Sequence, residues 1–267
     1  DDLNDKYKYA DSETVGTDLV GNQYVWIPVD GILGENGTTI DDVVNNGKIL
    51  LGRYEFSSDG TPSECISSKY KEETQEEHTD SKRTNAIAND IEGFIDSVRK
   101  NGGYYFARYE ASYGKNEKAN SKVSETFTTG GGIIKEGKLW NIVTQWDASK
   151  ACQDLYPGIN SDLMNSYAWD TAIIFIQREN KNYANQTSLN VTLQNTGTTG
   201  DVKCNIYDMA SNCYEFTTES NINIFNNYGC VLRGGNYSQS KQVTGNRIDG
   251  DPATEECLSF RPILYLE

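Results

Sequence analysis

Apolar residues in the first part of the chain form two short runs and one helical pattern. Residues 24–29 are an aromatic and β-branched run whose proline favours the edge or end of a sheet, so this segment predicts a strand. The run at 48–56 predicts a second strand. Between 87 and 98 apolar residues recur at helical spacing before an Asn-Gly-Gly stop, which predicts an amphipathic helix.

The next segments alternate between polar stretches and further elements. Residues 57–85 are almost wholly polar around a Lys-Glu-Glu-Thr-Gln-Glu-Glu run, so this segment is predicted to be a solvated insertion that buries little. Residues 104–110 predict a strand. Thr144 is a suitable N-cap for a helix reaching Leu155, and residues 166–178 predict another helix. The remainder, rich in Asn, Gly, Thr and Tyr, predicts long loops around few strands.

The composition favours one folded domain built on aromatic side chains. The apolar share is only 36%, but 4 Trp, 8 Phe and 17 Tyr each bury a large area. A length of 267 residues suits a single domain, which we place at 24–267 after an N-terminal extension or linker at 1–23. The tryptophans are predicted to stand in the core: Trp26, Trp140, Trp146 and Trp169.

The charge balance argues against two classes of partner. Lys and Arg number 24 against 39 Asp and Glu, and the net charge of −15 would repel nucleic acid and anionic membranes. No apolar run approaches the roughly 20 residues of a membrane helix. The residues after Asp1 do not form a signal peptide, so we expect a processed or trimmed chain and leave open whether an anchor lies upstream.

Six cysteines and one histidine limit the metal chemistry. No Cys-x-x-Cys occurs and His78 stands among acidic neighbours, which argues against zinc and against a histidine base. An even number of cysteines favours disulfides and hence an extracellular location. Six cysteines allow 15 pairings, so the residues alone leave the connectivity open.

Six segments occur in the order found in one protein family. They are 102–110 (GGYYFARYE), 146–148 (WDA), 163–170 (LMNSYAWD), 205–216 (NIYDMASNCYEF), 231–237 (VLRGGNY) and 259–262 (SFRP). Together they resemble the formylglycine-generating-enzyme-like (sulfatase-modifying factor) family, over roughly residue 24 to the end. The resemblance implies an α+β, C-type-lectin-like fold with small twisted antiparallel sheets, two to three helices and extensive irregular loops.

The family segments contain residues suited to tie loops together. Gly234 and Gly235 would let a strand end pass close to other backbone. Arg233 and Arg261 can donate hydrogen bonds to carbonyl and carboxylate groups. Four acidic residues are predicted to cap helices or tether loops: Asp147, Asp170, Asp208 and Glu215.

The resemblance also implies how the chain closes on itself. The first strand, 24–29, would pair with the last, 260–266. Lectin-like folds commonly clip a helix to the terminal strand, which implies a disulfide between Cys152 and Cys257. The other pairs would then be Cys213 with Cys230 and Cys65 with Cys204.

Catalytic members of this family hold copper with two cysteines that follow Arg-Gly-Gly. The matching positions here are Gln239 and Thr244, and neither side chain can replace a thiolate ligand of Cu(I). Related iron enzymes need several histidines. The chain also lacks a Gly-x-Ser-x-Gly elbow and a phosphate-binding glycine loop. A carboxylate pair for glycoside hydrolysis stays open without positive support, and we predict no enzyme, no catalytic residue and no resident cofactor.

One loop offers hard oxygen ligands for calcium. Its spacing is not that of an EF-hand and it lacks the lectin-type Trp-Asn-Asp, so a plain solvated loop is the alternative. The candidate ligands are Asn246, Asp249, Asp251 and Glu255.

These observations predict a non-enzymatic extracellular bacterial surface protein for ligand binding, adhesion or surface assembly. Tyr, Arg and amide side chains around the lost copper positions are typical of recognition surfaces. The predicted recognition face is Asn236, Tyr237, Gln239, Lys241, Asn246 and Arg247, with Tyr214 beside it. Its partner would be a protein or glycan at a cell surface. The alternatives are a pilin-like filament or surface-layer subunit contacting identical subunits, and an enzyme of unfamiliar chemistry.

Overall fold

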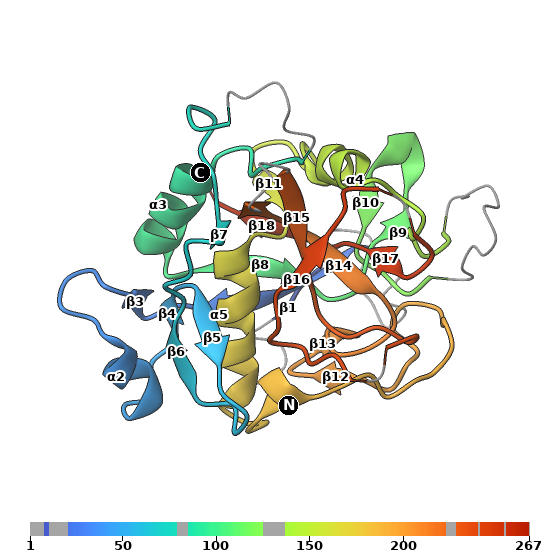
Figure 1. Ribbon diagram of the computed structural model, residues 1–267. Coiled ribbons are helices and arrows are strands. Elements are labelled where there is room, and N and C mark those ends of the chain that lie inside the picture. The colour runs from blue at the N-terminus through green and yellow to red at the C-terminus, as the bar shows by residue number, and fades with distance from the viewer. Residues whose placement is uncertain are drawn as a thin grey trace.

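The computed structural model describes residues 8–10, 21–78, 85–124, 137–222, 228–239, 241–253 and 255–266, and they form a mixed α+β fold (Figure 1). The described helices are α2 (Ile40–Val44), α3 (Ile91–Asn101), α4 (Gln145–Cys152) and α5 (Ser166–Gln177), with the 3-10 turns η1 (Lys115–Glu117) and η2 (Tyr183–Asn185). The strands are β1 (Lys8–Ala10), β2 (Gln23–Pro28), β3 (Gly31–Ile32), β4 (Leu50–Leu51), β5 (Tyr54–Phe56), β6 (Pro62–Glu64), β7 (Tyr70–Lys71), β8 (Gly103–Ala107), β9 (Ser112–Tyr113), β10 (Ala119–Asn120), β11 (Asn160–Leu163), β12 (Val202–Lys203), β13 (Ile206–Tyr207), β14 (Tyr214–Ile222), β15 (Tyr228–Arg233), β16 (Ile248–Gly250), β17 (Leu258–Ser259) and β18 (Pro262–Tyr265).

A five-stranded antiparallel sheet with the order β1-β2-β8-β18-β11 forms the centre of the molecule. Alternate residues of β2, β8 and β18 point to opposite faces because the side-chain period of a strand is two. One face, with Val25, Phe106 and Ile263, packs against α3 and α5. The other face, with Tyr24 and Leu264, is covered by the segment after α4.

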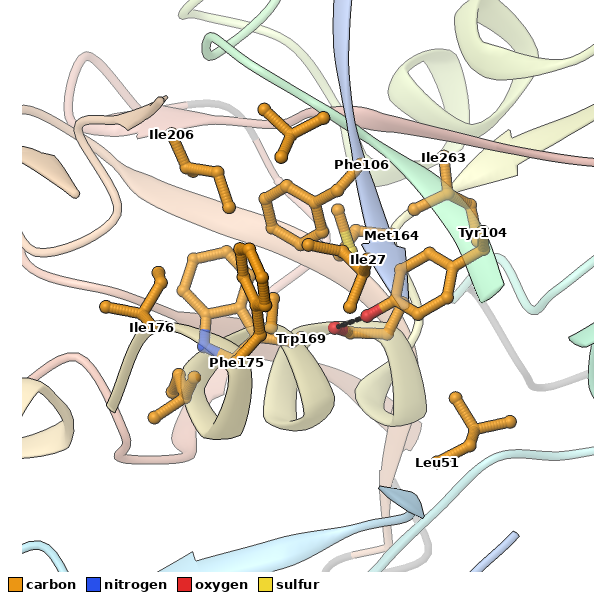
Figure 2. Close-up of a cluster of buried hydrophobic side chains, with 14 of the residues drawn as sticks. Ile27, Leu51, Tyr104, Phe106, Met164, Trp169, Phe175, Ile176, Ile206 and Ile263 are labelled. Atoms are coloured by element: carbon orange, nitrogen blue, oxygen red, sulfur yellow. Dashed lines mark hydrogen bonds between the residues drawn. The ribbon is translucent and has the colours of Figure 1, made fainter. Parts of the chain in front are cut away.

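The main core lies between this sheet and α5 (Figure 2). Trp169 is fully buried, and its ring centroid lies 6.4 Å from that of Phe106. The hydroxyl of Tyr104 donates to the carbonyl of Ala168 at 2.6 Å, which satisfies a polar group inside the core. Trp140 is also buried, but Trp146 is 50% exposed, so its predicted place in the core is wrong.

The second sheet has the order β16-β15-β14-β17, and β7 pairs with β14. β14 and β17 are parallel, whereas β15 is antiparallel to both β14 and β16. Its apolar side chains, including Phe216, Leu232 and Leu258, share a second core with α4. The two sheets and their helices therefore surround two neighbouring cores.

β2 and β18 correspond to the predicted first and last strands, and they belong to one sheet. The prediction that they pair with each other is wrong. β8 lies between them and pairs with both, so that Phe106 is opposite Val25 on one side and Ile263 on the other. β1, which lies inside the predicted N-terminal extension, pairs with the outer side of β2. β2 thus has both of its edges occupied, by β1 and by β8.

The three predicted helices are confirmed, but the residues at which they begin and end differ from the prediction. Asp90 accepts a hydrogen bond from the Gly93 amide, so α3 starts later than the apolar pattern suggests. Thr144 caps α4 as predicted, but the helix ends at Cys152 before Leu155. α5 closely matches its predicted range. The predicted strand at 48–56 is divided into β4 and β5.

The polar insertion at 57–85 buries more than expected. Within its described part, β6 and β7 are strands, and the carboxylate of Glu73 is fully buried. Ser220 donates to Glu73 at 2.9 Å, and Thr218 donates to Glu72 at 2.8 Å. Most of its described residues are exposed or half-buried, so the expectation of a solvated segment fails only where β14 contacts it. There the polar side chains of β14 bond to the acidic side chains of the segment, so apolar residues are not needed. Residues 79–84 lie outside the described residues.

The cysteines differ from the predicted pairing, since all six are free thiols. The pairs Cys152–Cys257, Cys213–Cys230 and Cys65–Cys204 are not formed. Their thiols have separate polar neighbours: Cys65 contacts Glu55, Cys204 contacts Glu179, Cys213 contacts the Glu256 carbonyl and Cys257 contacts Glu255.

Candidate functional site

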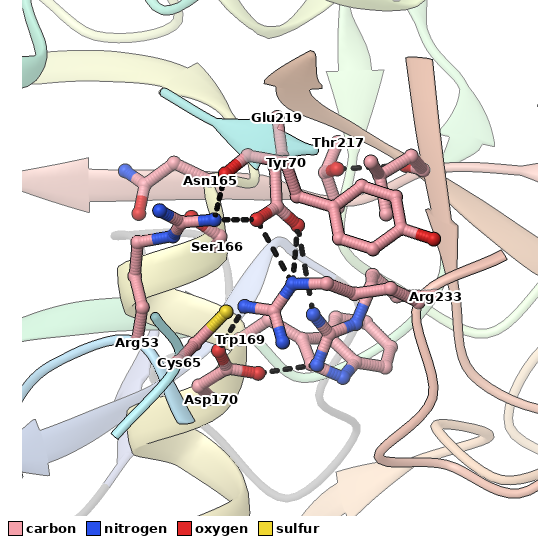
Figure 3. Close-up of polar contacts among 12 residues, drawn as sticks. Arg53, Cys65, Tyr70, Asn165, Ser166, Trp169, Asp170, Thr217, Glu219 and Arg233 are labelled. Atoms are coloured by element: carbon pink, nitrogen blue, oxygen red, sulfur yellow. Dashed lines mark hydrogen bonds and ion pairs between the residues drawn. The ribbon is translucent and has the colours of Figure 1, made fainter. Parts of the chain in front are cut away.

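Three arginines and two carboxylates meet where α5, β14 and β15 come together (Figure 3). Arg233, at the end of β15, pairs with Asp170 of α5, and both side chains are fully buried. Arg247 bridges the two acids: its Nη2 lies 2.6 Å from Asp170 and its Nε 2.9 Å from Glu219. Arg53 also pairs with Glu219. We call these five residues the arginine network.

Opposite effects act on the charges of the arginine network. Burial disfavours the charge of Arg247, but the nearby Asp170 and Glu219 carboxylates outweigh this effect and raise its pKa. Burial dominates at Arg233, where the pKa is lowered although Asp170 opposes the shift. Arginine still keeps its charge at neutral pH, so the network is a set of buried ion pairs whose members depend on one another.

The arginine network lies beneath the loop at 236–247 and fixes its second half. Arg233 donates to the Gly245 carbonyl at 3.3 Å, and Arg247 donates to the Tyr54 carbonyl at 2.8 Å. The indole of Trp169 donates to the Thr244 carbonyl at 3.2 Å. The backbone of this half of the loop is therefore held by side chains from the core.

Backbone contacts fix the remaining parts of the loop. The Gly245 amide donates to the Ala184 carbonyl at 2.8 Å, and the Thr244 amide donates to that of Gln186 at 3.1 Å. At the beginning, the Tyr237 amide donates to the Asn212 carbonyl at 2.9 Å. The loop is consequently held at both ends by elements distant in sequence.

The structure divides the predicted recognition face into exposed and buried residues. Gln239, Lys241 and Asn246 are exposed, and Tyr237 is half-buried. Asn236 is fully buried and Tyr214 is 4% exposed, although its hydroxyl lies beside the face and donates to Gln239 at 3.3 Å.

Arg247 also fails as a contact residue, because its side chain is only 5% exposed and belongs to the arginine network. The two positions at which the sequence resemblance would place copper ligands also differ in exposure. Gln239 is exposed, whereas Thr244 is fully buried and its hydroxyl donates to the Gln186 carbonyl at 3.0 Å. We define the recognition loop as residues 237–246, with its exposed amide and ammonium groups.

The predicted calcium ligands are not gathered into a metal site. Within the described ranges, no group of three or more His, Cys, Asp or Glu side chains could hold a metal ion. Asp249 instead accepts from Lys69 at 2.6 Å and from the Tyr70 hydroxyl at 2.9 Å. Asp251 accepts from the Ala253 amide, the Asn246 amide donates to Gln242, and Glu255 accepts from the Cys257 thiol.

The predicted tethering residues do hold the fold together. Asp147 binds the Thr144 hydroxyl at the start of α4, and Asp208 accepts from Thr199 and Gly197. Glu215 pairs with Arg261, which is fully buried. Gly234 and Gly235 pass against the backbone of Met209 and Ala210, as the sequence suggested.

Sequence reasoning missed two members of the arginine network, Arg53 and Glu219. Arg53 lay inside a predicted strand, and Glu219 lies in the polar run Thr-Thr-Glu-Ser-Asn. That run is fully or almost fully buried in β14. A usable signal was the coexistence of this polar run with the strand-forming Tyr-Glu-Phe before it, because a buried polar strand requires polar partners elsewhere.

Two buried carboxyl groups are expected to make stability depend on pH. Burial raises the pKa of Asp162 to about 7 and that of Asp208 to about 6, against opposing hydrogen bonds from the Asn89 and Leu163 amides and from Thr199. In the unfolded chain both carboxyls titrate near about 4. Their contribution to stability is therefore fully present below about pH 4 and lost as pH rises through 6 and 7.

Urea unfolding between pH 5 and 7.5 checks this expectation. The free energy of unfolding should fall with pH by up to roughly 1.4 kcal/mol per unit for each titrating carboxyl. Asp162→Asn should make this slope shallower, whatever its effect on absolute stability. A flat or rising free energy over this range would contradict the assigned shifts.

Comparison of the chain with protein-family models, with curated proteins and with solved structures gave no match. Among the described residues, no helix is long and apolar enough to cross a membrane.

Proposed function

We propose that the chain is a non-enzymatic extracellular surface protein that binds a partner protein or glycan through the recognition loop. One observation carries this proposal: exposed amide and ammonium groups stand on a loop that is held at both ends, at its second end by the buried arginine network. A loop held in advance loses little conformational entropy on binding. Binding residues are commonly found on loops that a rigid scaffold positions.

The side chains of the recognition loop suit contact with polar groups. Gln239, Lys241 and Asn246 supply donors and acceptors, and half-buried Tyr237 supplies an amphipathic ring. Tyr and small polar residues make adaptable contacts at low entropic cost. Tyr214 positions Gln239 from below by its hydrogen bond.

We assign the scaffold to the formylglycine-generating-enzyme-like, C-type-lectin-like fold. The segments that carry the resemblance support this assignment, because Arg233, Gly235 and Arg261 all stand at buried contacts between distant parts of the chain. Loss of the copper thiolates supports a binding role over oxidation. Thr244 adds to this, since its hydroxyl is used in a backbone contact.

Photo-crosslinking on intact cells that display the protein tests the proposed face. A benzophenone amino acid is placed at Gln239, Lys241 or Asn246, with exposed Gln75 and Lys181 as matched amide and ammonium controls. We expect one partner to be cross-linked from the three loop positions and from neither control. Cross-links from the controls but none from the loop would refute the recognition loop.

A filament or surface-layer subunit is the second candidate function, and two exposed apolar side chains favour it. Leu189 is 61% exposed and Val191 is 80% exposed. They follow Thr187, which forms a β-bridge with Val243 of the recognition loop. Exposed apolar side chains close together are typical of protein contacts. In the same experiment, cross-links to other copies of this chain would favour assembly over binding of a different partner.

A further inference from the structure

A pocket lies away from the recognition loop, between the β9–β10 hairpin with its turn η1 and the start of α4. Its volume is about 480 Å³, within the range of small-molecule sites. In Figure 1, α4, β9 and β10 lie together at one end of the molecule. The pocket shares no lining residue with the recognition loop, so a proposal for it stands independently of the proposed function.

Three residues that line this pocket have left-handed backbone conformations. Asn116 has φ 56°, Glu117 has φ 58° and Ile142 has φ 50°. Asn tolerates this region, but a β-branched residue such as Ile142 rarely adopts it. Strained backbone of this kind concentrates at ligand clamps and active sites, where the surrounding structure maintains it. Its clustering around one hollow therefore points to a function for that hollow.

One wall of the pocket is aromatic and rigid. The ring centroids of Tyr113 and Trp140 are 4.4 Å apart, and Trp140 packs in turn on Phe260 at 5.3 Å. Trp140 is only 6% exposed, so its edge is fixed by the second core. The half-buried Tyr113 ring, with Trp140 packed behind it, offers the apolar surface for the C–H face of a ring.

The rest of the lining is polar and balanced in charge. Lys118 and Lys150 are opposed by Glu117 and Asp147, so the four charged side chains sum to zero. Asp147 and Lys150 lie one turn apart on α4. The Lys150 ammonium is 5.3 Å from the exposed Trp146 ring, which does not line the pocket. Donors and acceptors of both signs suit the hydroxyl groups of an uncharged ligand better than an anion or a cation.

We propose that this pocket binds a neutral sugar unit of a glycan. The C–H face of the sugar lies against Tyr113, which Trp140 supports from behind, while its hydroxyls bond to Asp147, Lys150 and the Asn116 amide. An apolar ligand would displace water from these polar groups without replacing its hydrogen bonds, which costs binding energy. The balanced charge separates a neutral sugar from a nucleotide or an acidic metabolite.

Binding to a printed array of neutral mono- and oligosaccharides tests the proposal, followed by titration of the strongest binder. Lys150→Ala removes a donor, and Asn116→Gly removes the amide while a glycine accepts the positive φ without strain. We expect each variant to bind roughly tenfold more weakly or worse, as loss of such a hydrogen bond predicts. Asn116→Gly should unfold at a nearly unchanged temperature, because both residues tolerate this φ.

Lys181→Ala elsewhere on the surface is the matched control and should bind the array sugar normally, whereas Lys241→Ala reports any sugar that binds at the recognition loop instead. A protein that binds no neutral sugar would overturn the proposal. So would a sugar affinity that survives both pocket substitutions, or one that is lost only in Lys241→Ala. A purely structural role of Asn116 would give a stability change with no change in affinity.

Discussion

Arg261→Met is expected to lower the free energy of unfolding by about 3–5 kcal/mol. Arg261 is fully buried and its Nε donates to Glu215 at 2.6 Å. It also donates to the carbonyls of Ala107 at 3.1 Å and Tyr207 at 3.0 Å. Methionine would fill much of the same space but leave a buried carboxylate without its counter-charge and two carbonyls without donors.

The loss of stability in Arg261→Met should depend on the burial of its ion pair, and the same substitution at an exposed arginine tests this. Burial raises the pKa of Glu215, while Arg261 opposes this shift and favours the ionised form. Arg99 also forms ion pairs, with Glu35 and Asp96, but its side chain is 44% exposed. Arg99→Met should therefore cost no more than about 1 kcal/mol, as exposed ion pairs do.

Urea unfolding of both variants at pH 7 gives the comparison. Equal losses in Arg261→Met and Arg99→Met would show that burial of the Arg261–Glu215 pair does not govern stability. Adding Glu215→Gln to Arg261→Met should recover part of the loss, because the buried side chain then carries no charge. A double variant no more stable than Arg261→Met would argue for the lost carbonyl contacts as the main cost.

Local signals in the sequence predicted local structure well. Thr144 and Asn-Gly-Gly at 101–103 marked helix ends because capping depends on residues only a few positions apart. The Arg-Gly-Gly and Phe-Arg-Pro segments pointed correctly to buried tethers at Arg233 and Arg261. In each case the chemistry of the residue itself indicates its structural role, because arginine carries several N–H donors and glycine has no Cβ atom.

Long-range pairing could not be read from the same signals. β8 separates β2 from β18 although all three are apolar strands, and nothing in their patterns fixes the order of neighbours. Half-buried Glu72 and fully buried Glu73 accept hydrogen bonds from Thr218 and Ser220, nearly 150 residues away in sequence. A polar segment looks solvated until its polar partners are known.

The candidate site shows the same limit. Arg247 and Gln239 are both polar residues of one loop, yet Arg247 turns inward and Gln239 outward. The difference comes from Asp170 and Glu219, which are distant from the loop in sequence. Their buried carboxylates carry negative charge, and the Arg247 guanidinium turns inward to pair with it. Position in the loop was predictable, whereas the direction of each side chain was not.

Gly235→Ala is expected to lower the free energy of unfolding by at least about 4 kcal/mol or to prevent folding, a loss seen only for severe clashes. A Cβ atom at this position would lie 1.8 Å from the carbonyl oxygen of Ala210 and 2.5 Å from its carbon. Both are backbone atoms, so no side chain can rotate away. The local backbone is also fixed, because the Gly235 amide donates to the Met209 carbonyl at 3.2 Å and the Tyr237 amide to that of Asn212.

Gly158→Ala separates this clash from the general cost of losing a glycine. Gly158 has φ 76°, and a Cβ atom there would meet nothing within 4 Å, so its replacement should cost only about 1–2 kcal/mol of backbone strain. Urea unfolding of the two variants, with circular dichroism as the readout, measures the difference. If Gly235→Ala were as stable as Gly158→Ala, the close approach of 234–235 to 209–210 would be wrong. The assigned position of the recognition loop would then also be in doubt, because Tyr237, its first residue, comes shortly after the glycines that make this close approach.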